Sequence, residues 1–206
     1  MKKTRILIAD DHTIVRIGLS ALLNTQEDLE IVGEAGNGNE AVSEALRLNP
    51  DIVIMDLMMP KKDGVAAARE LKASNPKIKV IILTSFGTSD AIAHALETGV
   101  EGAVTKTADD SALISIVRKI ADGGRYVSPQ IRKVLQESPP IPELTVRQHD
   151  IIQSLARGLS NTDIAKQFGI APTVAREHIT IILNKLGASN RTEAVAIALR
   201  KHLLKI

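Results

Sequence analysis

Five side chains in the first half of the chain have the types and positions needed to bind a metal ion and a phosphoryl group. Asp10, Asp11, Asp56, Thr84 and Lys106 each end or follow a short apolar segment. Carboxylates that lie close together repel one another unless a cation joins them, and a ligand set made of oxygens favours a hard ion such as Mg²⁺. A free carboxylate, a hydroxyl and an ammonium group would complete a site for phosphoryl transfer. A lone aspartate after a strand is usually a loop or cap residue, so the prediction depends on all five together.

The spacing of apolar residues predicts the elements that would bring these side chains together. Five short segments rich in β-branched or small residues predict strands, at residues 6–9, 31–34, 52–55, 80–83 and 102–105. The stretches between them place apolar residues at helical spacing, as at Val15, Leu19 and Leu22. This alternation predicts an α/β unit with a flavodoxin-like, doubly wound (βα)5 parallel sheet. The functional crevice of such a sheet lies at the carboxyl ends of its strands, where the five side chains fall.

Composition and charge narrow the class of protein. The chain has 206 residues, 44% of them hydrophobic, which suits two small domains or one larger one. The lack of cysteine excludes disulfide scaffolds, Cys-ligated metal sites and cysteine nucleophiles. Residues 1–122 contain 14 Lys/Arg and 18 Asp/Glu, whereas residues 123–206 contain 12 and 6. This asymmetry reflects either uneven surface charge or an acidic domain joined to one that meets a polyanion.

The chain shows no segment typical of a membrane protein. Its apolar runs are short, with four residues at 80–83 and six at 194–199, whereas a membrane span needs roughly 18. The first nine residues resemble the start of a signal peptide, but Asp10 and Asp11 interrupt the apolar stretch. We therefore expect a cytoplasmic protein that does not bind a membrane.

Glycine and proline mark the boundary between two domains. Gly123 and Gly124 end the fifth predicted helix, and the prolines within 138–142 cannot continue a helix. We therefore place the first domain at 1–122, a linker at 123–142 and a second domain at 143–206. The spacing of apolar residues in the second domain predicts four helices, at 145–157, 161–168, about 173–186 and 191–204. The expected N-caps are Thr145, Asn161 and Asn190, and the expected C-terminal glycines are Gly158, Gly169 and Gly187.

The first domain resembles the receiver domain of bacterial two-component response regulators over essentially all of residues 4–122. The shared pattern is an Asp pair, then Asp-x-x-Met-Pro-x-x-x-Gly, then Thr-Ser and then Lys, and residues 56–64 read DLMMPKKDG. The resemblance implies that Asp56 accepts a phosphoryl group from a sensor histidine kinase. It also implies two further sets of residues: Mg²⁺ ligands at Asp10, Asp11, Asp56 and the Met58 carbonyl, and switch residues that contact the phosphoryl oxygens at Thr84 and Lys106.

Two positions depart from the usual receiver pattern. An aromatic residue that rotates inward commonly lies three residues before the lysine, but Ala103 occupies this position. The signal from Thr84 would then have to pass through backbone movement of the 85–90 loop and the helix after it. Proline often follows the lysine, whereas Thr107 follows it here and leaves the isomer of the Lys106–Thr107 peptide open.

The second domain contains the parts of a helix-turn-helix, namely a short helix, a turn with Gly169 and a second helix. Ile179, Ile182 and Leu186 of the second helix have the spacing of a buried face. The residues left on its open side, where a DNA major groove could receive them, are Arg176, Glu177, Thr180, Asn184 and Lys185. A plain helical bundle would offer the same side chains.

The order of short motifs resembles the LuxR-type DNA-binding domain over about residues 143–204. These motifs are Leu-Thr-x-Arg, Gly-x-Ser-Asn-x-x-Ile-Ala, Arg-x-His-Ile, Lys-Leu-Gly and Asn-Arg-Thr-Glu-Ala. Together with a receiver, this domain indicates a NarL/FixJ-type response regulator. The resemblance implies that Arg176, Glu177 and Thr180 face bases. It also implies contacts with the DNA phosphate backbone, or structural contacts within the domain, for Asn161, Lys185 and Arg191.

Several residues at the start of the second helix differ from the family pattern, and His178 has a second interpretation. Ala171 replaces a frequent serine, so the helix would be capped by Thr173 or capped poorly. The family's Thr-Val pair before the basic residue is Val174-Ala175 here, so a hydroxyl that contacts phosphate is missing or displaced. We expect His178 to face the core and form a hydrogen bond rather than contact a base.

Together these observations predict a transcription factor that is controlled by phosphorylation. When phosphorylated, it would bind promoter DNA as a homodimer. Its only catalysis would be self-catalysed phosphoryl acceptance and dephosphorylation. A dehalogenase-like phosphatase would need a second acid where Met58 stands, and a flavin binder would need aromatic loop residues beyond Phe86. The complete set of five site residues argues against a third hypothesis, a DNA-binding protein whose receiver domain has lost its function.

Overall fold

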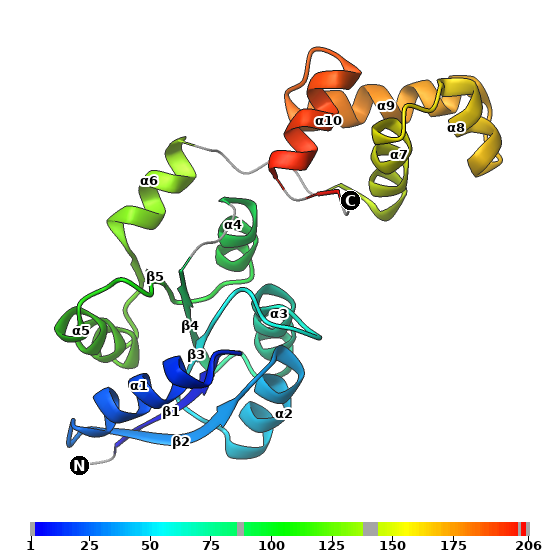
Figure 1. Ribbon diagram of the computed structural model, residues 1–206. Helices are drawn as coiled ribbons and strands as arrows, with labels where there is room; N and C mark the ends of the chain where they lie inside the picture. Colours follow the sequence, from blue (N-terminus) through cyan, green and yellow to red (C-terminus); the bar gives the residue numbers. More distant parts are fainter. Residues whose placement is uncertain (1–2, 86–88, 138–143, 202, 205–206) are drawn as a thin grey trace. The chain divides into compact units, whose positions relative to one another are not determined.

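The computed structural model describes residues 3–85, 89–137, 144–201 and 203–204, and the chain divides into two compact units at Pro139 and Pro140 (Figure 1). The first unit is an α/β structure and the second is helical. No helix within these described ranges is long and apolar enough to span a bilayer.

The first unit is built on a parallel sheet in the order β2-β1-β3-β4-β5-β6. Its strands are β1 (Thr4–Ala9), β2 (Leu29–Ala35), β3 (Ile52–Met55), β4 (Lys79–Thr84), β5 (Gly102–Thr105) and β6 (Tyr126–Val127). Its helices are α1 (Thr13–Asn24), α2 (Gly38–Leu48), α3 (Gly64–Ser74), α4 (Ser89–Glu97), α5 (Asp110–Ala121) and α6 (Pro129–Glu137). The five predicted strands and the flavodoxin-like order are confirmed.

Alternate residues of each strand face opposite layers of helices, because successive side chains of a strand point to opposite sides. Leu7 and Val53 pack with α2, α3, α4 and α6 on one face. Ile6 and Ile54 pack with α1 and α5 on the other face. Both faces are therefore covered, which explains the continuous apolar runs of β1, β3 and β4.

The predicted linker at 123–142 is wrong for much of its length. Residues 126–127 form β6, which pairs with β5, and residues 129–137 form α6. Ile131 of α6 is buried in the same core as Ala103 of β5. The first unit therefore extends well beyond residue 122, and residues 138–143 lie outside the described ranges.

The second unit consists of α7 (Val146–Ala156), α8 (Asn161–Phe168), α9 (Pro172–Leu186) and α10 (Arg191–Arg200) around one apolar core. All four predicted helices are confirmed, although the last ends four residues earlier than expected, at Arg200. The predicted glycines follow the first three helices with positive φ, of 78° at Gly158, 63° at Gly169 and 64° at Gly187.

Side-chain caps define the starts of these helices. Thr145 and Gln148 form a capping box at α7, and Asn190 caps α10, as predicted. The predicted cap at Asn161 is wrong, because Ser160 caps α8 and Asn161 is its first residue. The N-cap position of α9 is Ala171, which offers no side-chain hydrogen bond, so α9 has the poor cap that the sequence allowed.

Candidate functional site

Strand register brings Asp10 and Asp56 together at the carboxyl edge of the sheet. Ala9 is paired with Met55 in the parallel β1–β3 ladder, so the residues that follow each of them are neighbours. The Asp56 amide donates to the Ala9 carbonyl at 2.8 Å, which holds the start of the loop against β1. Both carboxylates are almost fully buried, with 2% of Asp10 and 4% of Asp56 exposed.

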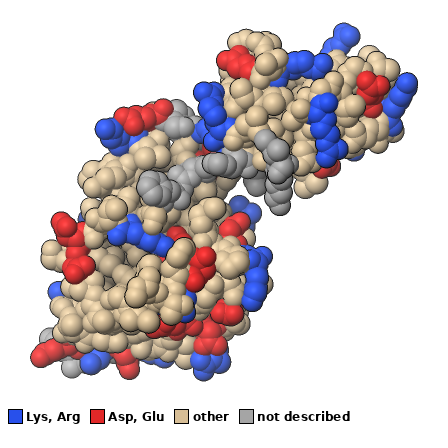
Figure 2. Space-filling model, in the orientation of Figure 1, with Lys and Arg blue, Asp and Glu red and all other residues tan. Residues whose placement is uncertain are grey.

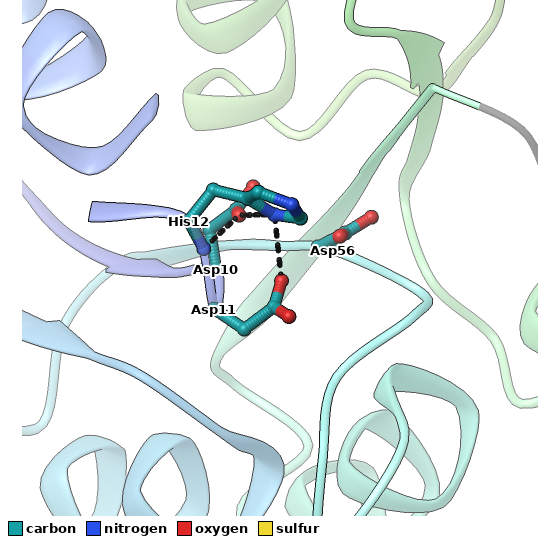
Figure 3. Close-up of side chains that lie close together, drawn as sticks. All are labelled: Asp10, Asp11, His12 and Asp56. Carbon is teal, nitrogen blue, oxygen red and sulfur yellow. Dashed lines mark hydrogen bonds and ion pairs between the residues drawn. The ribbon is translucent and has the colours of Figure 1, made fainter. Parts of the chain in front are cut away.

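Three of the predicted metal ligands converge, and a histidine joins them. Asp10, Asp11, His12 and Asp56 each place a ligand atom within 4.8 Å of the others (Figure 3). His12 Nδ1 lies 2.8 Å from an Asp11 oxygen and 3.3 Å from an Asp10 oxygen. His12 was not among the predicted ligands, although its place directly after the Asp pair was a usable signal.

Lys106 provides the positive charge of this site. Its Nζ lies 2.6 Å from Asp10 Oδ2 and 3.0 Å from Asp56 Oδ2, so it bridges the two buried carboxylates. Burial raises the pKa of Asp56, and the nearby charge of Asp10 adds to this effect while Lys106 opposes it. Burial disfavours the charged ammonium, but hydrogen bonds to Asp10 and Asp56 raise the pKa of Lys106. Lys106 therefore stays protonated between its partners at neutral pH.

Thr84 lies at the end of β4 with a hydroxyl that has no hydrogen-bond partner among the described residues. It is 2% exposed, so water does not readily replace a partner. Its carbonyl accepts from the Lys106 amide at 2.9 Å, which links the two predicted switch residues through the backbone. A buried donor without an acceptor suits a ligand with free oxygens.

The loop after Asp56 depends on a close backbone approach. A side chain at Gly64 would place its Cβ 2.1 Å from the Asp56 carbonyl oxygen, so only glycine fits. The Gly64 amide donates to the Leu57 carbonyl at 2.9 Å, which folds the loop back to the strand end. Met58 lies in this loop with 64% of its surface exposed, so its side chain has no role in the core.

The donor set fits Mg²⁺. Asp10, Asp11 and Asp56 supply carboxylate oxygens within one small volume, and hard divalent ions prefer such ligands. The three carboxylates outnumber the one lysine that contacts two of them, which leaves negative charge for a cation to offset.

The structure shows the surroundings of Ala103 and the isomer of the Lys106–Thr107 peptide, where the chain departs from the receiver pattern. Ala103 is buried at 1% exposure, and its carbonyl accepts from the Ser128 amide at 2.9 Å. No peptide bond is cis within the described ranges, so the Lys106–Thr107 peptide is trans. The expected signal loop at 85–90 includes residues 86–88, which lie outside those ranges.

Helix α9 presents most of the predicted DNA-contacting residues to solvent. Arg176, Glu177, Thr180 and Asn184 are exposed. The opposite face is buried in the core of the second unit and consists of Ala175, Ile179, Ile182 and Leu186. Figure 2 shows blue Lys and Arg side chains spread over this helical unit with few red ones, whereas both signs mix over the α/β unit.

Lys185 differs from its predicted place on the open side. It is only partly exposed, and its Nζ donates to Gln148 Oε1 of α7 at 3.0 Å. The same Gln148 oxygen accepts from the Thr145 amide of the capping box, also at 3.0 Å. Lys185 therefore ties α9 to the start of α7, which agrees with the structural role that the resemblance allowed.

Arg191 and Asn161 contact each other within this unit, whereas one nitrogen of His178 has no partner among the described residues. Arg191 reaches the Leu159 carbonyl at 3.2 Å and the Asn161 side chain at 3.4 Å, as expected for structural residues. His178 is partly buried, but its Nδ1 has no hydrogen-bond partner in the described part of the chain. The prediction of a hydrogen bond from His178 is wrong for this nitrogen.

Comparison with known proteins agrees with both units. The response regulator receiver domain family matches residues 6–118, and the luxR family of bacterial regulatory proteins matches residues 142–198. The chain is 38% identical to the response regulator protein VraR of Staphylococcus epidermidis over 98% of this chain and 99% of that protein. It is 37% identical to VraR of Staphylococcus aureus over the same shares.

Solved structures give the same result. The response regulator ChrA of a heme-sensing two-component system is 33% identical, with a TM-score of 0.59 over 99% of this chain and 100% of that one. The response regulator RcsB in complex with DNA has the same fold, with a TM-score of 0.67 and 23% identity over 97% of this chain and 99% of that one.

A receiver fold with an acidic site, followed by a helix-turn-helix unit, defines a DNA-binding regulator of transcription rather than a classical enzyme. This chain belongs to the two-component response regulators that carry a LuxR-type DNA-binding domain. Receiver domains bind Mg²⁺ at an acidic pocket, and the aspartate cluster of this chain is such a pocket.

Proposed function

We propose that Asp56 accepts a phosphoryl group from a sensor histidine kinase, and that the phosphorylated protein binds promoter DNA as a homodimer. The observation that carries this proposal is the environment of Asp56. Its carboxylate is buried at a strand end, 3.0 Å from Lys106 Nζ. The neighbouring strand β4 ends at Thr84, whose hydroxyl has no hydrogen-bond partner among the residues that the structure describes. A nucleophile, a cation and a free donor are the groups that phosphoryl transfer needs.

The transfer follows from the chemistry of these groups. A carboxylate oxygen of Asp56 attacks the phosphorus of the kinase phosphohistidine, and the P–O bond forms as the P–N bond breaks and its electron pair returns to the imidazole. Lys106 then pairs with a phosphoryl oxygen in place of Asp56 Oδ2, and Thr84 donates its hydroxyl to another. Asp10, Asp11, Asp56 and the Met58 carbonyl would hold Mg²⁺, which offsets the negative charge of the phosphoryl oxygens when bound.

The switch would begin at Thr84 and leave the site through the backbone. Ala103 has no side chain that could rotate, so the movement of Thr84 toward a phosphoryl oxygen would shift the loop that joins β4 to α4. A shift between two loop conformations changes the population that can dimerise.

The DNA contacts would come from the exposed face of α9. Arg176, Glu177 and Thr180 would face base edges, and Asn184 would extend the same surface. The positive charge of the helical unit supports contact with phosphates. The solved structures of RcsB include one with two dimers on two parallel DNAs, which supports a dimer as the DNA-binding form of this chain.

Phosphate incorporation tests the proposal directly. The full chain is incubated with acetyl phosphate and Mg²⁺, and its intact mass is measured together with DNA affinity and light scattering. We expect one phosphoryl group on the wild type, none on Asp56→Asn or in EDTA, and tighter DNA binding by a phosphorylated dimer. Asp28→Asn is the matched control, since Asp28 is an exposed carboxylate that pairs with Arg118 at 2.7 Å. Undiminished labelling of Asp56→Asn would overturn the assignment.

A further inference from the structure

Two large apolar side chains are exposed on the helix that carries the proposed DNA contacts. Ile181 of α9 is 43% exposed and Val174 is 37% exposed. Their neighbours Ile179 and Ile182 are buried in the core of the second unit, and Leu183 packs against it. The helix therefore already has a complete buried face, and packing within the described part of the unit does not account for Val174 and Ile181.

The two side chains share one flank of the exposed face with Glu177. Residues seven apart on an α-helix lie two turns apart on nearly the same side, and Glu177 lies between them, three residues after Val174 and four before Ile181. Seven residues rise about 10.5 Å along the helix, which corresponds to about three base-pair steps of about 3.4 Å in DNA. The flank thus presents an apolar group, a carboxylate and a second apolar group at the spacing of stacked bases.

The chemistry of the whole face favours base edges as its occupant. The remaining exposed side chains of the central face are short and polar, namely Thr173, Thr180 and Asn184, with Arg176 at the far flank. Lys185, which lies beside Ile181 on the helix surface, is turned back to Gln148 of α7. In the major groove, the thymine 5-methyl group is the apolar feature of a base pair, and a cytosine or adenine amino group is a donor to a carboxylate.

We infer that Val174 and Ile181 are specificity-determining residues that contact thymine 5-methyl groups, on either side of a base whose amino group donates to Glu177. This inference rests on the proposed placement of α9 in the major groove. It assigns the chain a preference for half-sites with two thymines about three base-pair steps apart and a cytosine or adenine at one of the two positions between them. Loss of one buried methyl contact corresponds to about a fourfold fall in affinity.

Uracil substitution tests the inference, because uracil is thymine without its 5-methyl group. The full chain first selects duplexes from a random library, and each thymine of the selected duplex is then replaced singly by deoxyuridine. We expect about a fourfold loss of wild-type affinity at one position for each apolar residue. Ile181→Ala should lose the sensitivity at one of these positions only, and Val174→Ala at the other.

Leu199→Ala is the matched control, since Leu199 is 38% exposed but belongs to α10. It should keep the wild-type uracil pattern whatever its overall affinity. Uracil positions without effect on the wild type, or an unchanged pattern in Ile181→Ala and Val174→Ala, would refute the inference and leave DNA binding by α9 intact. Failure of the wild type to enrich any duplex would refute the proposed function as well, so the two failures are distinguishable.

Discussion

Replacement of Lys106 by methionine removes the cation that lies between two buried carboxylates. Removal of one partner from a buried ion pair costs about 3–5 kcal/mol. The Lys106 side chain is 13% exposed, whereas the side chains of Asp10 and Asp56 are 3% and 5% exposed, so some solvent screening favours the lower end of that range. We expect Lys106→Met to lower the free energy of unfolding of the first unit by about 3 kcal/mol in EDTA, or its Tm by about 12 °C.

Mg²⁺ should restore part of this loss. The ammonium group and a divalent ion bind the same carboxylates, so removal of Lys106 leaves more negative charge for the ion to offset. A ligand that binds only the folded state raises the free energy of unfolding according to its affinity. The stability gained on addition of Mg²⁺ should therefore be larger for Lys106→Met than for the wild type.

Tyrosine fluorescence gives a selective assay for this prediction. The chain contains one tyrosine and no tryptophan, and Tyr126 belongs to β6 of the first unit, so its signal in a urea titration follows this unit. Lys72→Met is the matched control, because Lys72 pairs with Glu101 at 2.5 Å away from the acidic site. The control should lose stability but gain no more from Mg²⁺ than the wild type. A free energy of unfolding for Lys106→Met within about 0.5 kcal/mol of wild type in EDTA would refute the reasoning.

Four further changes separate the remaining roles. Thr84→Ala should accept phosphate but lose the phosphate-dependent gains in dimerisation and DNA affinity, measured by light scattering and titration; retained gains would show that the signal bypasses Thr84. DNA affinity should fall with salt, and Arg176→Ala should reduce discrimination between selected and random duplexes by about 1–3 kcal/mol; titrations that show equal loss on both duplexes would contradict a base contact. Lys185→Met should speed hydrogen exchange in α7 and destabilise the helical unit by about 1 kcal/mol, whereas unchanged exchange with weaker DNA binding would favour the phosphate contact. Ala103→Phe should destabilise the first unit by about 1–3 kcal/mol in a urea titration, and an unchanged midpoint would show that the core has room.

The acidic site was predictable because the residue types indicate its chemistry and their positions after predicted strands indicate its location. Asp10 and Asp56 each follow a continuous apolar run that predicts a buried strand, and Lys106 follows a short segment of small and β-branched residues. Parallel strands align such positions at one edge. The contact of Lys106 with two carboxylates, rather than with one, was not predictable. It depends on side-chain distances of 2.6 and 3.0 Å, which periodicity does not determine.

Two errors in the helical unit, at Lys185 and at the cap of α8, have separate physical causes. The sequence shows which face of α9 is apolar, but it does not show how far a long side chain bends. Lys185 lies at the border of the two faces, where its flexible stem allows the ammonium to reach either DNA or Gln148. The cap of α8 was misplaced by one residue because Ser160 and Asn161 are both good N-cap types, and only the backbone shows that Ser160 is the residue with extended φ and ψ.

The missed elements of the first unit and the small residue at 103 belong to one structural feature. Ala103 pairs with Val127 of β6, and its carbonyl accepts from Ser128, which immediately precedes α6. Ile131 of α6 is then buried in the same core as Ala103. Because interiors are close-packed, a large aromatic side chain at 103 would have to displace the helix that covers it. The replacement of the usual aromatic by alanine is therefore the counterpart of an added strand and helix at the edge of the sheet, and the two-residue length of β6 explains why strand periodicity did not reveal it.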